Sequence, residues 1–302
     1  MSRSASSWSR RQALESIATR SPVKGQLAQI RTLGASAPRS ELARYYDLDV
    51  ADERADIDMY LALASASDGP ILELACGTGR ICNRIAAAGH DVTGVDIDPD
   101  MLDRARRAWS EASGQAREEG SLTLLQADAT GLSLNRRFDL VILGFNSLLV
   151  IGNGDAAAQQ EVLRTMARHL TRDGRAVIDT WLPAHEDLAL YDGRLIHEWT
   201  RRDPETGEQV SKTTSATYEE QTGKATIDTF FDAWHEGESP RRTSRRDIVH
   251  FPSRDELPAT IESAGLAPQV IAGDYDMSPL EEGSERVITV AAKRPSRPLE
   301  RI

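Results

Sequence analysis

The chain has 302 residues, of which 40% are hydrophobic, so it can form one large α/β domain with an insertion or two small domains. No apolar run approaches the roughly 18 residues of a membrane span, and the N-terminus has no apolar signal-peptide core. The net charge is −11, and the two cysteines, Cys76 and Cys82, match neither a zinc pattern nor a disulfide framework. We expect a reduced, cytoplasmic protein without a metal.

Residues 1–40 are basic, whereas the rest of the chain is acidic. They hold seven Lys and Arg residues and one acid, which leaves a net charge of −17 on residues 41–302. This segment is rich in Ser and Ala, and we expect a mobile arm with marginal helices. The acidic main body argues against a nucleic-acid substrate.

Two helices are expected before the first strand. Ser40 is a candidate N-cap for a helix through Tyr45 and Tyr46, and residues 56–66 carry apolar side chains on one helical face.

Residues 70–80 read as a strand followed by a glycine turn. The apolar run 71–74 predicts a buried strand, and a helix is expected over 80–88. Gly77 and Gly79 permit a tight turn and a close backbone approach to a ligand, so a side chain at Gly79 should occupy ligand space. This is the first half of a nucleotide-binding βαβ unit.

The glycine turn matches neither of two common phosphate-binding fingerprints. A dinucleotide fingerprint needs a glycine where Cys82 stands, and a Walker loop needs Lys and then Ser or Thr where Arg80 and Ile81 stand. The chain instead reads ELACGTGR and then VTGVDID, where Asp96 ends a strand and can accept hydrogen bonds from ribose hydroxyls. These stretches closely resemble the first two motifs of class I S-adenosylmethionine (SAM)-dependent methyltransferases. A generic Rossmann-like turn without SAM is the alternative.

The resemblance implies a SAM site at the carboxyl ends of parallel strands. Tyr46, which precedes an aspartate, is implied to close over the methionine end of SAM, although packing of the helix on the domain is equally open. Asp128 is implied to lie beside the adenine amino group, a donor that suits a carboxylate. The expected cofactor-binding residues are Tyr46, Glu73, Ala75, Gly77, Gly79, Arg80, Asp96, Ile97, Met101, Asp128, Ala129 and Phe145.

Strands and helices alternate as far as residue 181, which predicts a parallel sheet. A strand is expected at 175–181, preceded by a turn at Asp173 and Gly174. The resemblance implies a Rossmann-like seven-stranded sheet, mostly parallel and completed by a C-terminal antiparallel hairpin at 267–275 and 285–292.

Between about residues 193 and 251 the apolar period becomes two, which predicts an inserted antiparallel β meander. The SAM-binding core then comprises 41–192 and 252–294. We expect the insertion to form a cap over the methyl-transfer site or a subunit interface of a homo-oligomer. It should determine the acceptor and contribute little to SAM binding. Trp234 and Arg245 are its candidate acceptor-binding residues, and a charged edge strand is the alternative for the arginine.

Methyl transfer requires mainly that donor and acceptor be positioned in line. His185, Tyr46 and Asn146 are the candidate catalytic residues, and Asn146 is also a candidate for contact with the acceptor or for capping its own loop. We expect a SAM-dependent methyltransferase that acts on nitrogen or oxygen of a small metabolite and releases S-adenosylhomocysteine. The alternatives are a SAM-binding cyclase or decarboxylase, or a non-catalytic SAM-binding subunit.

Overall fold

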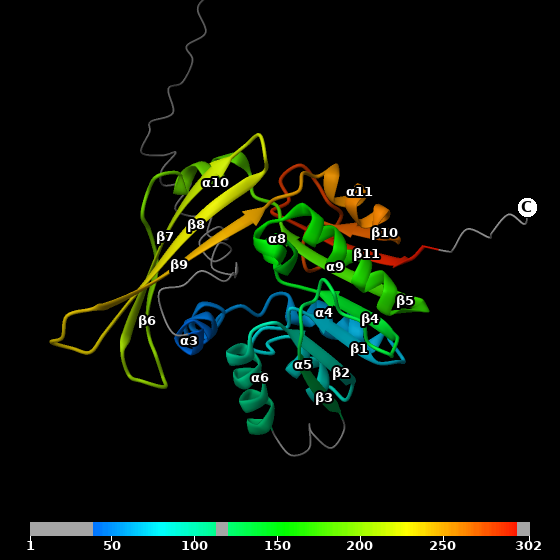
Figure 1. Cartoon of the computed structure of the whole chain (residues 1–302), viewed down its shortest axis with the longest axis horizontal. Coiled ribbons are helices and arrows are strands. Elements are labelled where there is room, and N and C mark those ends of the chain that lie inside the picture. The colour runs from blue at the N-terminus through cyan, green and yellow to red at the C-terminus, as the bar shows by residue number, and fades with distance from the viewer. Residues whose placement is uncertain (1–38, 113–119, 295–302) are drawn as a thin grey trace, which may run out of the picture.

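The computed structural model of the chain describes residues 39–112 and 120–294. A seven-stranded sheet is flanked by helices, and a separate four-stranded sheet stands beside it, with helix α3 between the smaller sheet and the main domain (Figure 1). The basic segment 1–40 lies outside the described residues, apart from its last two.

The first part of the described chain contains the first five strands of the large sheet and the helices around them. In chain order these elements are α3 (Arg39–Asp49), α4 (Ile57–Ser65), β1 (Ile71–Leu74), α5 (Cys82–Ala87), β2 (Asp91–Asp96), α6 (Pro99–Glu111), β3 (Ser121–Gln126), β4 (Phe138–Leu143), α8 (Ser147–Val150), the 3-10 turn η2 (Ile151–Asn153), α9 (Ala156–His169), β5 (Leu170–Trp181) and α10 (His185–Tyr191). The smaller sheet and the end of the chain follow as β6 (Ile196–Arg202), β7 (Gln209–Glu219), β8 (Lys224–Trp234), β9 (Arg241–His250), α11 (Glu256–Ser263), β10 (Leu266–Ala272) and β11 (Arg286–Lys293).

The strand order of the large sheet is β10-β11-β5-β4-β1-β2-β3. Strands β1 to β5 pair in parallel, whereas β11 pairs antiparallel to both β5 and β10. Every residue of β1 is buried, because helices cover both faces of a parallel sheet. The predicted fold class is confirmed, and the carboxyl ends of the parallel strands form one edge.

Three details differ from the sequence prediction. Strand β5 begins at Leu170, so Asp173 and Gly174 lie inside it, where its pairing with β4 shifts register between Phe138 and Leu140. The apolar residues Val162, Leu163, Met166 and Leu170 indicate a helix from about 162 to 170, whereas α9 starts at Ala156 and ends at His169. The short helices α8 and α10 were not predicted, because they are too short for a periodic signal.

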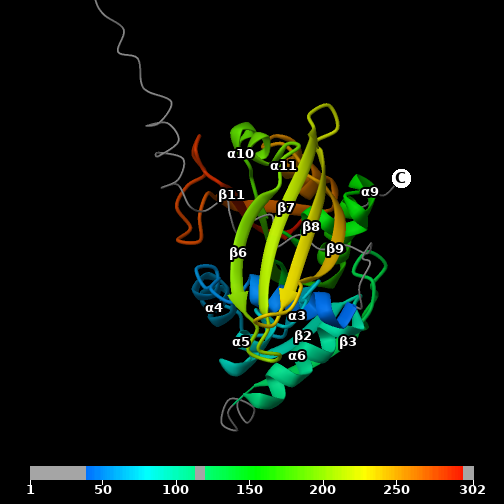
Figure 2. The ribbon, with the colours of Figure 1, turned by 90° about the vertical axis from the view of Figure 1, so that its left-hand side faces the viewer.

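The four-stranded sheet has the order β6-β7-β8-β9 and is antiparallel throughout (Figure 2). Buried and half-buried residues alternate along β8, so the sheet has an inner and an outer face. The inner face packs against two apolar clusters. One, the upper cluster, includes Trp181, Tyr191 and Ile227, and the other, the α3 cluster, includes Tyr45 and Phe231.

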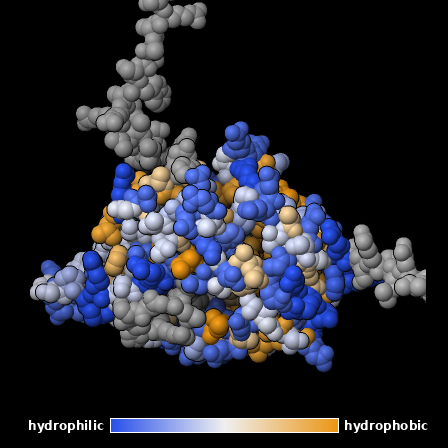
Figure 3. All heavy atoms as spheres, turned by 45° about the horizontal axis from the view of Figure 1, so that its top comes forward, coloured by the Kyte–Doolittle hydropathy of each residue, from blue (hydrophilic) through white to orange (hydrophobic). Residues whose placement is uncertain are grey.

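The face of the molecule seen in Figure 3 is mostly hydrophilic, with apolar residues in small scattered spots. Within residues 39–112 and 120–294, no helix combines the length and apolarity needed to cross a membrane.

Candidate functional site

A cavity of about 500 Å³ lies at the carboxyl edge of the large sheet. It is lined by helix α3, by the segments that follow β1 to β4, and by residues of α8, η2 and α9. Eight of the residues expected to bind the cofactor line it: Tyr46, Ala75, Gly77, Asp96, Ile97, Asp128, Ala129 and Phe145. Segments far apart in sequence meet here because parallel strands end at the same edge.

The glycine turn is tied to the second strand by Asp96. Ala75, Gly77 and Gly79 all have positive φ angles, of 55°, 58° and 81°. Asp96 Oδ2 accepts from the Gly77 amide at 2.7 Å, and Oδ1 accepts from the Asp98 amide at 2.9 Å. Each carboxylate oxygen can accept a further hydrogen bond, so Asp96 at the cavity wall suits a ribose.

Ile97 and Asp128 also line the cavity. The Ile97 side chain is 48% exposed, which is unusual for a large apolar residue and provides a surface for a planar ring. Asp128 uses Oδ1 to accept from both the amide and the hydroxyl of Thr130, each at 2.8 Å. A carboxylate beside an apolar surface fits an adenine ring with its amino group, so the cavity fits SAM.

Three of the expected cofactor residues lie outside the cavity lining. Glu73 is buried, and its Oε2 accepts from the Cys82 amide at 2.8 Å. Burial raises the pKa of Glu73 to about 8. Met101 is buried on α6. A Cβ at Gly79 would lie 2.8 Å from Asn83 Oδ1 and 3.0 Å from Ala105 Cβ, so the neighbours of Gly79 are protein atoms.

Arg80 is also held outside the cavity lining. Its guanidinium donates to both carboxylate oxygens of Asp56 and, at 3.3 Å, to the Glu53 carbonyl. The same group lies 3.8 Å from the centroid of the Phe145 ring. Arg80 therefore supports Phe145, which does line the cavity.

The turn after β4 is fixed by Asp179 on β5. Phe145 and Asn146 have φ angles of 53° and 65°. Asp179 Oδ2 accepts from the Phe145 amide at 3.2 Å, and its carbonyl accepts from the Asn146 amide at 3.1 Å. Asn146 is fully buried, and its side-chain oxygen accepts from the Trp181 amide. The structure thus places the Asn146 side chain within the turn and outside the cavity lining.

Of the remaining candidates, Arg245 and Trp234 are not brought together. His185 is the first residue of α10, and its side chain lies outside what the structure describes. Arg245 is buried on the inner face of the smaller sheet, where it pairs with Asp247 at 2.6 Å. Trp234 lies on the outer face, because β8 alternates and its buried residues face inward. One acceptor on one chain cannot touch both Arg245 and Trp234.

Sequence reasoning missed the part of the cavity wall formed by Asp98, Ser147 and residues 150–153. Asp98 is the last residue of the VDID stretch, so a sequence signal for it was present. In the segment 152–154, Gly, Asn and Gly all have positive φ angles, of 63°, 60° and 69°, which two glycines flanking an asparagine permit. In the part of the chain that the structure describes, no group of three or more His, Cys, Asp or Glu residues is arranged to hold a metal ion.

Comparison with known proteins agrees with this geometry. Residues 71–174 match the model of a methyltransferase domain. A relative from Streptomyces fradiae, dTDP-3-amino-3,6-dideoxy-alpha-D-glucopyranose N,N-dimethyltransferase, is 32% identical over 50% of this chain and 57% of its own length. The chain thus spans little more than half of that relative. A second, dTDP-3-amino-3,4,6-trideoxy-alpha-D-glucopyranose N,N-dimethyltransferase from Streptomyces venezuelae, is 26% identical over 74% of this chain and 86% of its own.

Solved structures share the fold. DesVI from Streptomyces venezuelae superimposes with a TM-score of 0.64 at 20% identity, covering 85% of this chain and 99% of its own. SAM-bound CalS10 from Micromonospora echinaspora, an amino pentose methyltransferase, gives 0.60 at 19% identity, covering 87% and 100%. The glycine turn, the strand-end carboxylates, the sheet order and these matches lead to one conclusion: residues 71–174 form a methyltransferase domain, the chain has the fold of SAM-dependent methyltransferases, and its cavity suits SAM as methyl donor.

Proposed function

We propose that this enzyme methylates the amino group of a small, hydroxyl-rich acceptor of the amino-sugar type, presented as a nucleotide-linked sugar. The two curated relatives described above are N,N-dimethyltransferases of dTDP-linked amino sugars by name. The observation that carries the proposal is a group of polar side chains buried on the inner face of the smaller sheet.

This polar band consists of Thr214, Thr229, Arg245 and Asp247. Thr229 pairs with Thr214 on one side and with Arg245 on the other, so the band crosses β7, β8 and β9. All four side chains are at most 5% exposed. The hydroxyls of Thr214 and Thr229 have no hydrogen-bond partner among the described residues. Because a buried hydroxyl without a partner costs free energy, a bound polar molecule is a fitting partner for them.

Along β9, the residues on either side of the band contact elements that line the SAM cavity. On one side, Thr243 of β9 donates to Glu41 of α3 at 3.0 Å, and α3 carries Tyr46 into the cavity. On the other side, Val150 lines the cavity and packs in the same cluster as Val249 of β9. An acceptor held under the band would therefore reach the cavity between α3 and α8.

The proposed acceptor needs little from acid–base chemistry. SAM supplies a methyl group activated by the positive sulfur. A neutral amine has its own lone pair, so the protein must orient the amine and exclude water rather than supply a strong base. We assign orientation of the amine to Tyr46, recognition of acceptor hydroxyls to the band with Arg245, and removal of the proton released from nitrogen to His185. Asn146 holds the turn that carries Phe145.

We also propose that the enzyme acts in the cytoplasm, a proposal supported by Cys76 and Cys82, which form no disulfide. The outer face of the smaller sheet, with the half-buried Phe230 and Trp234, is the proposed contact in a homo-oligomer. Light scattering of the purified protein tests the oligomer, and a monomer would refute it. The acidic net charge of −11 supports an acceptor other than nucleic acid.

A direct assay tests the acceptor. The protein is incubated with SAM and a dTDP-linked 3-amino-3,6-dideoxy sugar, and S-adenosylhomocysteine and the sugar product are quantified by mass spectrometry. The control sugar has a hydroxyl in place of the amine. We expect methyl groups on the amino sugar only. Equal turnover of the hydroxyl sugar, or no turnover of the amino sugar by a protein that binds SAM, would refute the proposal.

A further inference from the structure

Helix α3 faces two different partners. Tyr46 lines the SAM cavity. Its neighbour Tyr45 is fully buried and stacks on Phe231 of the smaller sheet, with ring centroids 4.8 Å apart and planes inclined by 28°. Figure 1 shows α3 between the smaller sheet and the main domain. The position of Tyr46 at the cavity therefore depends on how α3 sits on the sheet.

A buried ion pair fixes the last turn of α3 to the sheet. Lys212 Nζ on β7 lies 2.8 Å from Asp49 Oδ2, and the two side chains are 0% and 2% exposed. The indole N–H of Trp199 on β6 donates to Asp49 Oδ1 at 2.6 Å. Both carboxylate oxygens are thus satisfied by the sheet. A buried pair of this kind contributes little net stability, but it strongly disfavours any position of α3 that separates the charges.

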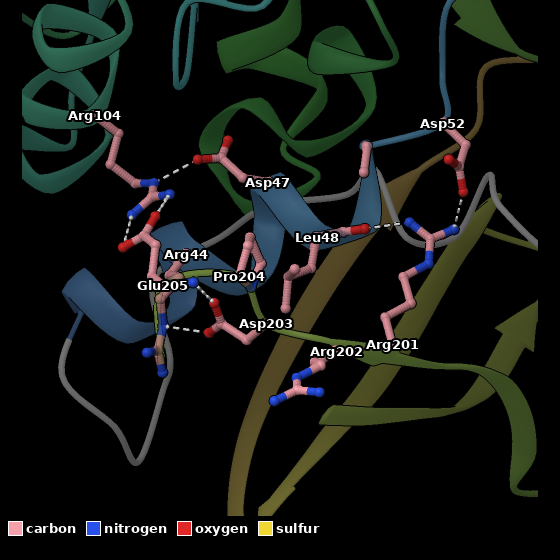
Figure 4. A pocket seen from close by; sticks show the side chains of 11 residues that line it. Arg44, Asp47, Leu48, Asp52, Arg104, Arg201, Arg202, Asp203, Pro204 and Glu205 are labelled. Atoms are coloured by element: carbon pink, nitrogen blue, oxygen red, sulfur yellow. Dashed lines mark hydrogen bonds and ion pairs between the residues drawn. The ribbon is translucent and has the colours of Figure 1, made fainter. Parts of the chain in front are cut away.

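Arginine contacts also join α3 to the smaller sheet and to the turn that follows β6 (Figure 4). Arg201 of β6 donates to the carbonyls of Leu48 and Asp49, which form the negative end of the helix dipole. Arg44 of α3 lies 3.2 Å from Asp203, in the turn after β6.

The main domain holds the helix from the other side. Arg104 of α6 binds Asp47 of α3 and Glu205 of the turn after β6. A single guanidinium thus joins the main domain, α3 and the inserted sheet (Figure 4).

We propose that the inserted sheet is part of the SAM-binding machinery, with Lys212 and Trp199 as positioning residues that hold α3 so that Tyr46 faces the cavity. The described lining of the cavity includes no residue of β6 to β9, so the sheet acts on SAM through α3. This inference runs against the expectation from sequence that the insertion contributes little to SAM binding. It concerns the cofactor and does not depend on the identity of the acceptor.

The proposal has a reciprocal consequence. If docking of α3 strengthens SAM binding, SAM must strengthen docking of α3 by the same factor. Amide hydrogens of residues 39–49 should then exchange more slowly when SAM is bound.

The first test is Lys212→Met, which removes the ammonium and leaves the Asp49 carboxylate buried. We expect calorimetry to show a SAM Kd raised by about tenfold or more, corresponding to about 1.4 kcal/mol. Hydrogen exchange of residues 39–49 should be faster, whereas that of β1 and β4 should be unchanged. Parental SAM affinity and parental exchange of α3 in a folded Lys212→Met protein would overturn the proposal.

Two matched variants separate positioning from general loosening. Ile227→Ala removes packing on the same inner face but in the upper cluster, so it should lower Tm and leave the SAM Kd unchanged. The double variant Asp49→Leu with Lys212→Met removes both charges and should restore the Kd to within about threefold of the parent. An increase in Kd for Ile227→Ala as large as that for Lys212→Met would overturn the proposal, and so would a double variant no better than the single one.

If Lys212→Met fails to fold, Trp199→Phe answers the same question. It keeps an aromatic ring near Phe231 and removes only the hydrogen bond to Asp49. We expect a SAM Kd raised by about threefold, from the loss of one hydrogen bond to a carboxylate that the lysine still satisfies, and faster exchange of α3. An unchanged Kd with unchanged exchange would overturn the proposal. Failure of the acceptor assay alone would leave all these results intact, because they use SAM only.

Discussion

At the residue scale, the cavity depends on residues in a left-handed backbone conformation that favours glycine. Ala75 and Phe145 both line the cavity with positive φ angles of 55° and 53°. Such a conformation costs a non-glycine residue about 1–2 kcal/mol and persists only where neighbours enforce it. For Phe145 that neighbour is the Asp179 carboxylate, which accepts a hydrogen bond from the Phe145 amide. The same carboxylate also accepts from Arg286 at 2.6 Å and from the Tyr60 hydroxyl at 3.0 Å.

Asp96→Ala should weaken SAM binding by about 1.5–3 kcal/mol, roughly 10- to 100-fold, because a charged acceptor for hydrogen bonds is lost. The variant also frees the Gly77 and Asp98 amides that Asp96 now binds. Calorimetry with SAM measures the effect, and Asp96→Asn, which keeps one acceptor oxygen, is the matched control with a smaller loss. Unchanged affinity in Asp96→Ala would show that the ribose lies elsewhere.

Glu73 should make stability depend on pH. Burial raises the pKa of Glu73 from 4.5 to about 8 in the folded protein. Between these pH values the folded state holds a proton on Glu73 that the unfolded state has lost. The contribution of Glu73 to the free energy of unfolding is therefore complete below about pH 4.5 and is lost as the pH rises through about 8. Glu73→Gln keeps an acceptor for the Cys82 amide and cannot ionise.

We therefore expect the Tm of the parent to fall relative to that of Glu73→Gln as the pH increases from 5 to 8. Thermal unfolding at several pH values measures this difference. Parallel curves for the two proteins would mean that Glu73 is ionised in the folded state at neutral pH.

Gly79→Val should act on folding rather than on the ligand. A side chain at this position would meet Asn83 and Ala105, and the φ angle of 81° adds strain of about 1–2 kcal/mol. We expect a lower Tm, measured by calorimetric unfolding without SAM. A variant with parental Tm that has lost SAM binding would show instead that the side chain occupies ligand space.

At the scale of elements, the inner face of the smaller sheet combines apolar packing with the polar band. The upper cluster and the α3 cluster lie toward its two ends, and the band crosses the strands between them. Strand alternation supplies this arrangement, because buried residues recur at every second position of β8.

Thr229→Val tests the band without changing the volume of the side chain. It removes a buried hydroxyl that has no partner among the described residues, so the Tm should stay equal or rise. The acceptor KM should increase several-fold, and the SAM Kd should remain parental. Thr226→Val, on the outer face of the same strand, is the matched control and should change neither constant. An unchanged acceptor KM in Thr229→Val would place the acceptor outside the band.

At the scale of the whole molecule, the two sheets depend on each other. The smaller sheet covers Trp181, Leu188 and Tyr191 of the main domain, and it holds Tyr45 and Leu48 of α3. Burial of each such side chain contributes about 1.5–3 kcal/mol.

Replacement of residues 193–251 by a short Gly-Ser linker should therefore yield a protein with lower Tm, exposed apolar surface and no measurable SAM binding. Calorimetry and binding of a hydrophobic dye measure these properties. A compact, stable core with parental SAM affinity would contradict both the packing argument and the proposed role of the sheet in SAM binding.

The sequence by itself determined the features that rest on local pattern. The change of apolar period separates the parallel core from the inserted meander, and the glycine turn places Gly77 beside Asp96. Asp128 was named from the family resemblance, and it lines the same cavity because parallel strands end at one edge and bring the residues that follow them together.

Only the tertiary structure decided which of the remaining candidates face the cavity. Arg80 lies against Asp56, and the Asn146 side chain binds the Trp181 amide, and neither contact leaves a local signal. Lys212 and Asp49 are 163 positions apart, and nothing in either neighbourhood predicts that they meet. Such contacts depend on how the inserted sheet and α3 pack on the core, and packing of that kind is set by long-range burial rather than by spacing along the chain.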